Sequence, residues 1–112
     1  MVVHGLSDDE ADRIFQALAD RTRRDIVERV LVAEQSVSVL AERYSMSFAA
    51  VQKHVAVLER AGLVRKERRG REQIVSAAVD VIHQANELLD AYENLWQHRV
   101  ARIDALLDPE GD

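Results

Sequence analysis

The stretch that decides the fold reads SVLAERYSMSFAAVQKHVAVLERAG and spans residues 38–62. Its first part predicts a short helix that Ser38 caps and that ends near Tyr44. The serines that follow break this helix, and Ser47 is expected to cap a longer helix that Gly62 ends at the C′ position. Two helices joined by such a short turn form a helix-turn-helix, whose second helix enters the major groove of DNA.

The second helix, expected from Phe48 to Ala61, has two different faces. At about 100° per residue, one arc collects the apolar side chains of Val51, Val55 and Leu58. The opposite arc, which faces DNA in this interpretation, holds Ala49, Gln52, Lys53 and Ala56. Gln52 carries the donor and acceptor pair that recognises adenine, Ala49 can contact a thymine methyl group, and Lys53 can reach guanine or a phosphate.

Side chains in the turn and at the borders of these arcs have two interpretations each. Phe48 either packs on a thymine methyl group or anchors the turn beside Met46. His54 is expected to make a structural contact or a phosphate hydrogen bond rather than to bind a metal. Ser45 and Ser47 are placed to contact phosphate through their hydroxyl groups, although helix capping alone explains them.

Residues 63–77 are expected to form a β-hairpin with its tip near Gly70. The hairpin carries five cations, which are Arg65, Lys66, Arg68, Arg69 and Arg71. The segment from Arg43 to Arg71 holds eight Lys or Arg and two Glu, a net +6, whereas the rest of the chain carries −11. A hairpin that only improves solubility is the alternative. Its position directly after the second helix favours a wing that binds the DNA backbone or the adjacent minor groove.

Helices are also predicted on both sides of this segment. The sequence from Ser7 to Glu10 has the form of a capping box and begins a helix at about residues 8–19. A second helix is expected at about residues 21–33. A longer apolar pattern at about residues 79–107 predicts a helix of about 40 Å, at ~1.5 Å per residue. One small domain does not cover a helix of that length, so a partner chain is expected.

Length and composition set further limits. A chain of 112 residues fits a single domain, residues 1–112, that is mainly α with a small β-hairpin wing. The expected fold is thus a dimeric winged helix-turn-helix in the order α-α-α-α-β-β-α. The absence of Cys agrees with a reducing compartment. No apolar run is long enough to cross a bilayer and the amino terminus does not resemble a signal peptide, so we expect a cytoplasmic protein without a membrane partner.

Catalytic motifs are missing from the sequence. It has no glycine-rich phosphate loop, no nucleophile elbow and no His-x-x-x-His pair. The acidic residues near the amino terminus are explained by the helix start, where the macrodipole favours anions. We therefore expect no enzyme and no cofactor.

The helix-turn-helix and its flanks resemble the ArsR/SmtB winged-helix repressors of bacteria. The sequence FQALADRTRRDI at residues 15–26 is similar to the amino-terminal signature of that family, although a Pro is usual where Arg21 stands. Residues 38–42 and 47–64 resemble its DNA-binding region, and the resemblance covers about residues 10–107. It implies a homodimer in which helices 8–19 and 79–107 pair, and repression through a near-palindromic DNA operator.

The resemblance also raises the question of metal sensing. The thiolate pair of the family would fall on Ser36 and Ser38, so that site is absent. The site on the last helix would select Ile82, Glu93 and Trp96 after Asp80, and these do not fit either. We expect no metal site, and we expect His83 and His98 to be exposed or to lie at the dimer interface.

The last helix instead resembles a branch of the family that lacks recognised metal sites and ends in a Trp-containing dimer helix. The expected dimer interface comprises Ile14, Phe15, Leu18, Leu88, Leu89, Tyr92, Leu95, Trp96, Val100, Ile103 and Leu107. Trp96 is either interface core or part of a pocket for an apolar small-molecule effector. A winged helix that binds another protein instead of DNA is the remaining alternative, against which the clustered Arg and Lys argue.

Overall fold

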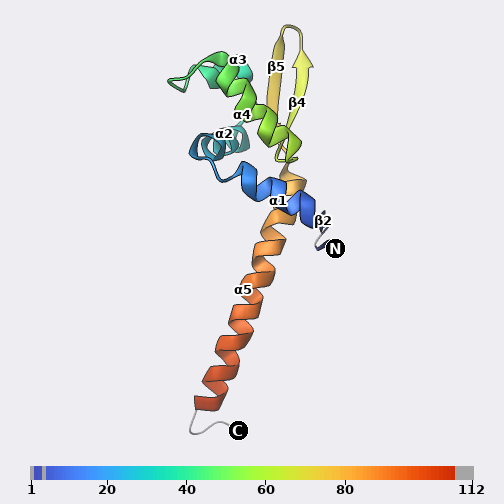
Figure 1. Ribbon diagram of the computed structural model, residues 1–112, viewed down its shortest axis with the longest axis vertical. Coiled ribbons are helices and arrows are strands. Elements are labelled where there is room, and N and C mark those ends of the chain that lie inside the picture. The colour runs from blue at the N-terminus through green and yellow to red at the C-terminus, as the bar shows by residue number, and fades with distance from the viewer. Residues whose placement is uncertain (1, 4, 108–112) are drawn as a thin grey trace.

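The structure is a computed structural model that describes residues 2–3 and 5–107. Its helices are α1 (Asp8–Ala17), α2 (Arg21–Val32), α3 (Val37–Ala41), α4 (Phe48–Arg60) and α5 (Val79–Leu107). Its strands are β1 (Val2–Val3), β2 (Leu6–Ser7), β3 (Gln35–Ser36), β4 (Val64–Arg69) and β5 (Glu72–Ala77). The helices α1 to α4 and the hairpin β4–β5 form one globular part, from which α5 projects (Figure 1). The name "head" is used below for residues 5–78.

Side-chain caps set where the helices of the head begin. Ser7 and Glu10 form the predicted capping box of α1, and Asp20 accepts the backbone N–H of Arg23 at the start of α2. Ser47 accepts the N–H of Ala50 at 3.1 Å and begins α4 at the predicted residue. Each cap satisfies one of the backbone donors that the first turn of a helix leaves without a partner.

The predicted cap of the short helix is wrong. Ser36, not Ser38, caps α3 by accepting the N–H of Val39 at 3.1 Å. The helix begins at Val37 because Val37 and Leu40 lie three residues apart, which puts both on the face that is buried. Ser38 is then a solvent-exposed residue inside the first turn.

The sheet has the order β3-β5-β4 and is antiparallel throughout. Strands β4 and β5 pair from Val64 with Ala77 to Arg69 with Glu72, so the turn falls at Gly70, which has a φ of 62°. This is the predicted wing. Two short pairings were not predicted: β3 pairs with β5, and β1 pairs with β2.

The core lies between the helices of the head and the sheet. Its largest fully buried side chains are Ile14, Ile26, Leu40, Val51, Val55, Leu58, Leu63, Val64 and Val75. Helix α5 contributes no buried residue along its 29 residues. Its beginning packs on the core of the head through the half-buried Val81, Ile82 and Ala85. The molecule is therefore elongated, with extents of 68 × 30 × 20 Å.

Candidate nucleic-acid interface

Helix α4 places its two predicted arcs as expected. Val51, Val55 and Leu58 are completely buried. Ala49, Gln52 and Lys53 are exposed, and Ala56 is half-buried. The buried arc fixes the rotation of the helix, so the polar arc necessarily faces outward.

The start of α4 and the wing enclose a small hollow of about 170 Å³. Phe48 and Gln52 line it from α4, and Arg68 and Arg71 line it from the wing. Phe48 is 47% exposed, so it lies at the surface and does not fold under the turn. Met46 is half-buried against the core and is the anchor of the turn. Ser45, which is expected to contact phosphate together with Ser47, is exposed.

His54 lies on the inner border of α4 and contacts the corner between α1 and α2. Its Nδ1 is 3.5 Å from Nη1 of Arg23 and 4.0 Å from Oδ1 of Asp20. Arg23 in turn donates hydrogen bonds to the carbonyl oxygens of Ala17 at 2.7 Å and Gln16 at 3.2 Å. These contacts favour the structural interpretation of His54, because its ring already faces a partner inside the head.

Three of the five wing cations form ion pairs with carboxylates of the same chain. Arg65 donates to both oxygens of Asp80 at 2.8 Å. Lys66 lies 3.6 Å from Glu59. Hydrogen bonds from the Arg65 guanidinium lower the pKa of Asp80.

Arg69 makes the most extensive of these pairings. It contacts Glu34 at 2.5 Å and Glu67 at 3.2 Å. The hydrogen bonds with Glu34 and Glu67 raise the pKa of Arg69, and the same guanidinium lowers the pKa of Glu34. No signal in the sequence pointed to Glu34, because it lies 35 positions before Arg69 and the two meet only through the sheet order β3-β5-β4.

Arg68 and Arg71 are held differently. Within residues 5–107, Arg68 donates only to the carbonyl oxygen of Gly70, at 3.2 Å. Arg71 forms no ion pair with any carboxylate among residues 5–107. The wing therefore presents two exposed guanidinium groups beside the exposed face of α4 that its own carboxylates do not neutralise.

The apolar side chains expected at a dimer interface follow one face of α5 and the neighbouring side of α1. Exposed members of this set are Phe15, Leu89, Tyr92, Leu95, Trp96, Ile103 and Leu107, with exposures from 39% to 74%. Leu18, Leu88 and Val100 are half-buried. Ile14 does not belong to this surface, because it is 1% exposed and packs in the core of the head.

Phe15, Leu88 and Tyr92 line a hollow of about 260 Å³ where α1 meets α5. Further along α5, the guanidinium of Arg99 lies 5.7 Å from the ring centre of Trp96. His83 and His98 are both exposed, and the described part of the chain contains no group of three potential metal ligands. No helix in that part is long and apolar enough to cross a membrane.

A short helix, a turn and a capped helix with an exposed polar face, followed by a basic antiparallel hairpin, define a winged helix-turn-helix DNA-binding protein. Residues 18–67 match a protein family described as a helix-turn-helix domain. The chain is 35% identical over 101 residues to the HTH-type transcriptional regulator Rv2034 of Mycobacterium tuberculosis. The aligned residues cover 90% of this chain and 92% of the relative.

Solved structures agree with this assignment. An ArsR-like transcriptional regulator from Rhodococcus sp. RHA1 superposes with a TM-score of 0.76 at 32% identity, over 90% of this chain and 95% of that one. A homodimeric winged helix-turn-helix domain from Mycobacterium bovis, a possible ArsR-family regulator, superposes with a TM-score of 0.63 at 26% identity, over 85% and 94%. The chain belongs to the ArsR family of winged helix-turn-helix transcriptional regulators, and it is a DNA-binding regulator of transcription.

Proposed function

We propose that this regulator is a homodimeric repressor that binds a near-palindromic operator, with one head in each half-site. The observation that carries the proposal is the placement of the exposed face of α4 beside Arg68 and Arg71 of the wing. A helix face in the major groove and a cationic hairpin on the flanking backbone are the two contacts that a winged helix makes with duplex DNA.

Distinct roles follow for the residues of this surface. Ala49, Gln52 and Lys53 contact base edges, and Phe48 packs on an apolar base group such as a thymine methyl. The turn serines, Ser45 and Ser47, contact phosphate, and the exposed Arg68 and Arg71 contact the backbone without first leaving a carboxylate. Contacts from Arg65, Lys66 and Arg69 require their ion pairs to open, so we expect smaller contributions from them.

The dimer part of the proposal rests on α5. A helix of 29 residues without a buried side chain leaves its apolar face in water unless a second chain covers it. Two heads joined through α1 and α5 would contact half-sites separated by about one turn of DNA, or multiples of it. Such a dimer represses when its operator overlaps the site that polymerase needs.

The test begins with selection of bound duplexes from a random pool, followed by fluorescence anisotropy on the selected operator. Gln52→Ala should weaken binding by about 1–3 kcal/mol and relax the preference at one base pair in each half-site. Arg71→Gln should weaken binding to all DNA sequences alike and reduce the slope of log K against log salt concentration by about 1 for each head. Arg102→Gln removes the same charge from α5 and is the matched control, which should bind like the unmodified chain.

A winged helix that binds only another protein would give no shift on any duplex at low salt. Selected sequences without two-fold symmetry would contradict the near-palindromic operator. An increase in transcription from the selected operator when the protein is added would contradict repression.

A further inference from the structure

A second basic hollow, of about 320 Å³, lies between α1, α2 and α4. Three arginines line it, one from each helix: Arg13, Arg23 and Arg60. No carboxylate of residues 5–107 is among its lining residues. The concentration of positive charge is unexpected here, because the hollow is outside the proposed DNA-binding surface.

Arg23 is fixed in place at the inner end of this hollow. Its side chain is only 18% exposed, and it donates to the carbonyl oxygens of Gln16 and Ala17 at the end of α1. Those carbonyl groups would otherwise present the negative end of the helix dipole to the hollow. Asp20 lies 3.9 Å from Arg23 but does not line the hollow. Arg23 thus places a fixed positive charge where the carbonyl end of α1 would otherwise present a negative one.

Arg13 and Arg60 are exposed and available. Neither forms an ion pair with a carboxylate in the described part of the chain. Arg13 contributes to the lowered pKa of Glu10 only as the smallest cause, after the backbone and side chain of Ser7. The guanidinium groups of Arg13 and Arg60 can therefore turn toward a ligand without breaking an existing pair.

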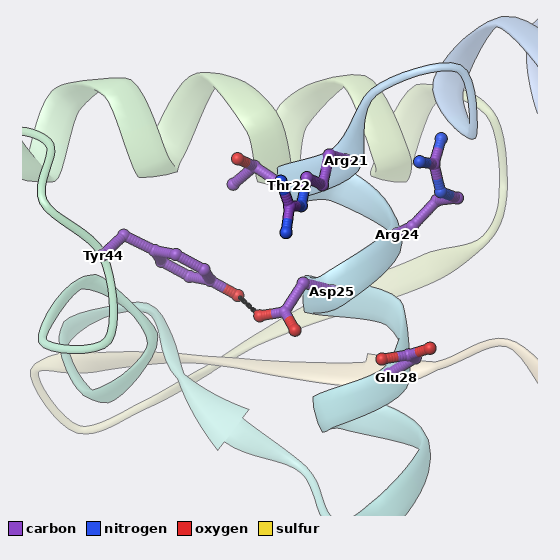
Figure 2. Close-up of a pocket in the computed structure, with 6 residues that line it drawn as sticks. All are labelled: Arg21, Thr22, Arg24, Asp25, Glu28 and Tyr44. Atoms are coloured by element: carbon purple, nitrogen blue, oxygen red, sulfur yellow. Dashed lines mark hydrogen bonds between the residues drawn. The ribbon is translucent and has the colours of Figure 1, made fainter.

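Another hollow of the head, beside α2, differs in its charge. It is lined by Arg21 and Arg24 but also by Asp25 and Glu28, so its charges balance (Figure 2). The phenol of Tyr44 is hydrogen-bonded there to Asp25, as Figure 2 shows. That site has its own counter-ions. In the hollow between α1, α2 and α4, the carboxylate nearest to Arg23, that of Asp20, does not line the site. Arg13 and Arg60 have no ion-pair partner in the described part of the chain, which is the arrangement that an anionic ligand completes.

We propose that the hollow between α1, α2 and α4 binds a small organic anion, with a carboxylate or phosphate group held by Arg13 and Arg60 against Arg23. The other lining side chains include Val57, Ala61 and Ala17, which suit a short apolar portion of the same molecule. A volume of about 320 Å³ is at the lower end of the range for small-molecule pockets.

The site is independent of both surfaces described above. Arg60 ends α4 about 18 Å from Phe48, at ~1.5 Å per residue, so DNA seated at the start of α4 does not cover it. Figure 1 shows α1 crossing the end of α4 that lies away from the wing tip. On α1, the hollow uses Arg13, whereas the junction with α5 uses Asp12 and Phe15.

Occupancy has a route to the DNA-binding helix, because the anion would bridge α1 to α4. Arg23 also contacts His54, which is next to Lys53 on α4. An anion that tightens this junction changes the orientation of α4 and hence its affinity for DNA. This regulatory consequence rests on the proposed function, whereas binding of the anion does not.

The test is isothermal titration calorimetry of the full chain with three probes: inorganic phosphate, phenyl phosphate and citrate. Ionic strength is held constant with sodium chloride, because dissolved salt screens the attraction between the arginines and the anion. We expect saturable binding of at least one organic probe. Arg13→Gln and Arg60→Gln should each weaken its association about tenfold, the size of one charge-assisted hydrogen bond. Arg102→Gln should leave it unchanged.

Three results would overturn the site: no saturable binding of any organic probe, equal binding by Arg13→Gln and the unmodified chain, or binding of inorganic phosphate as tight as that of the organic probes. Weaker self-association of Arg13→Gln and Arg60→Gln without a loss of anion binding would make the hollow a protein interface instead. Operator anisotropy with saturating probe tests the regulatory part, and an unchanged DNA affinity would refute it. Failure to bind any DNA would count against the proposed function and leave the anion titration valid.

Discussion

The head and α5 are both rich in apolar residues but use them in opposite ways. In the head, apolar side chains from four helices and the hairpin bury one another, and nine large ones are less than 2% exposed. In α5, not one of 29 residues is buried, and Leu95 and Trp96 remain 67% and 53% exposed. The head is therefore stable through its own contacts, whereas most of α5 would gain its stability from the second chain of the proposed dimer. This difference predicts that folding of the head and pairing of α5 can be disturbed separately.

The largest effect should come from the core of the head. Leu58 is completely buried on α4, so Leu58→Ala should lower the free energy of unfolding by about 2–5 kcal/mol. Leu31→Ala, at a position that is 49% exposed, is the matched control and should change it by less than about 0.5 kcal/mol. Urea denaturation at one fixed protomer concentration measures both, because dimerisation makes apparent stability depend on concentration. Equal losses would show that burial in the core of the head does not determine the stability of the head.

The next effect should fall on α5 alone. Trp96→Ala should weaken self-association by about 2 kcal/mol, roughly 30-fold, because a large aromatic side chain near the middle of an interface dominates its energy. Sedimentation equilibrium measures the dissociation constant. His98→Ala lies two positions away, on the other side of α5, and should dimerise normally. An unchanged constant for Trp96→Ala would remove α5 from the interface.

Local sequence signals predicted the head well. The apolar spacing of Val51, Val55 and Leu58 and the cap at Ser47 act within one helix, so they identified α4 to within one residue. The predicted cap at Ser38 was wrong, because the burial of Val37, a tertiary contact, puts the start of α3 after Ser36. The two-residue strands β1, β2 and β3 are too short to show a strand period.

Contacts between distant segments were not predictable in the same way. Ile14 and Phe15 are adjacent apolar residues on one helix, and only the packed fold shows that the first enters the core and the second the surface. The Glu34–Arg69 pair joins residues 35 positions apart. The arginines of the second basic hollow come from three helices, and no sequence spacing links them.

A smaller effect is expected from the polar contact that joins α2 to the segment after α3. The Tyr44 hydroxyl donates to Oδ2 of Asp25, which also accepts from Arg29 at 2.8 Å. Tyr44→Phe should lower the free energy of unfolding by about 1 kcal/mol, the usual size of one hydrogen bond. Self-association should not change, which separates the head from α5 again.

The same variant has a pH signature. Burial, followed by the hydrogen bond to Asp25, raises the pKa of Tyr44 to about 12 from its usual value of 10.0. The contribution of the neutral phenol is therefore complete below pH 10 and is lost as the pH rises through about 12. The unmodified chain should lose stability over that window more steeply than Tyr44→Phe, as followed by circular dichroism at each pH. Parallel curves would show that the phenol has no such raised pKa.

The smallest effect should appear within the wing. Glu34 holds Arg69 in an exposed ion pair, and such pairs contribute about 0.2–1 kcal/mol. Glu34→Gln should leave Arg69 paired with Glu67 alone, so that Arg69 reaches phosphate more easily, and should strengthen operator binding by up to about fivefold at low salt. Glu42→Gln removes the same charge from an exposed position of the helix-turn-helix and controls for the general change in net charge. Adding Arg69→Gln should abolish the gain of Glu34→Gln but not that of Glu42→Gln. If both Glu variants respond alike, the pair does not restrain Arg69, and the wing binds through its net charge rather than through individual arginines.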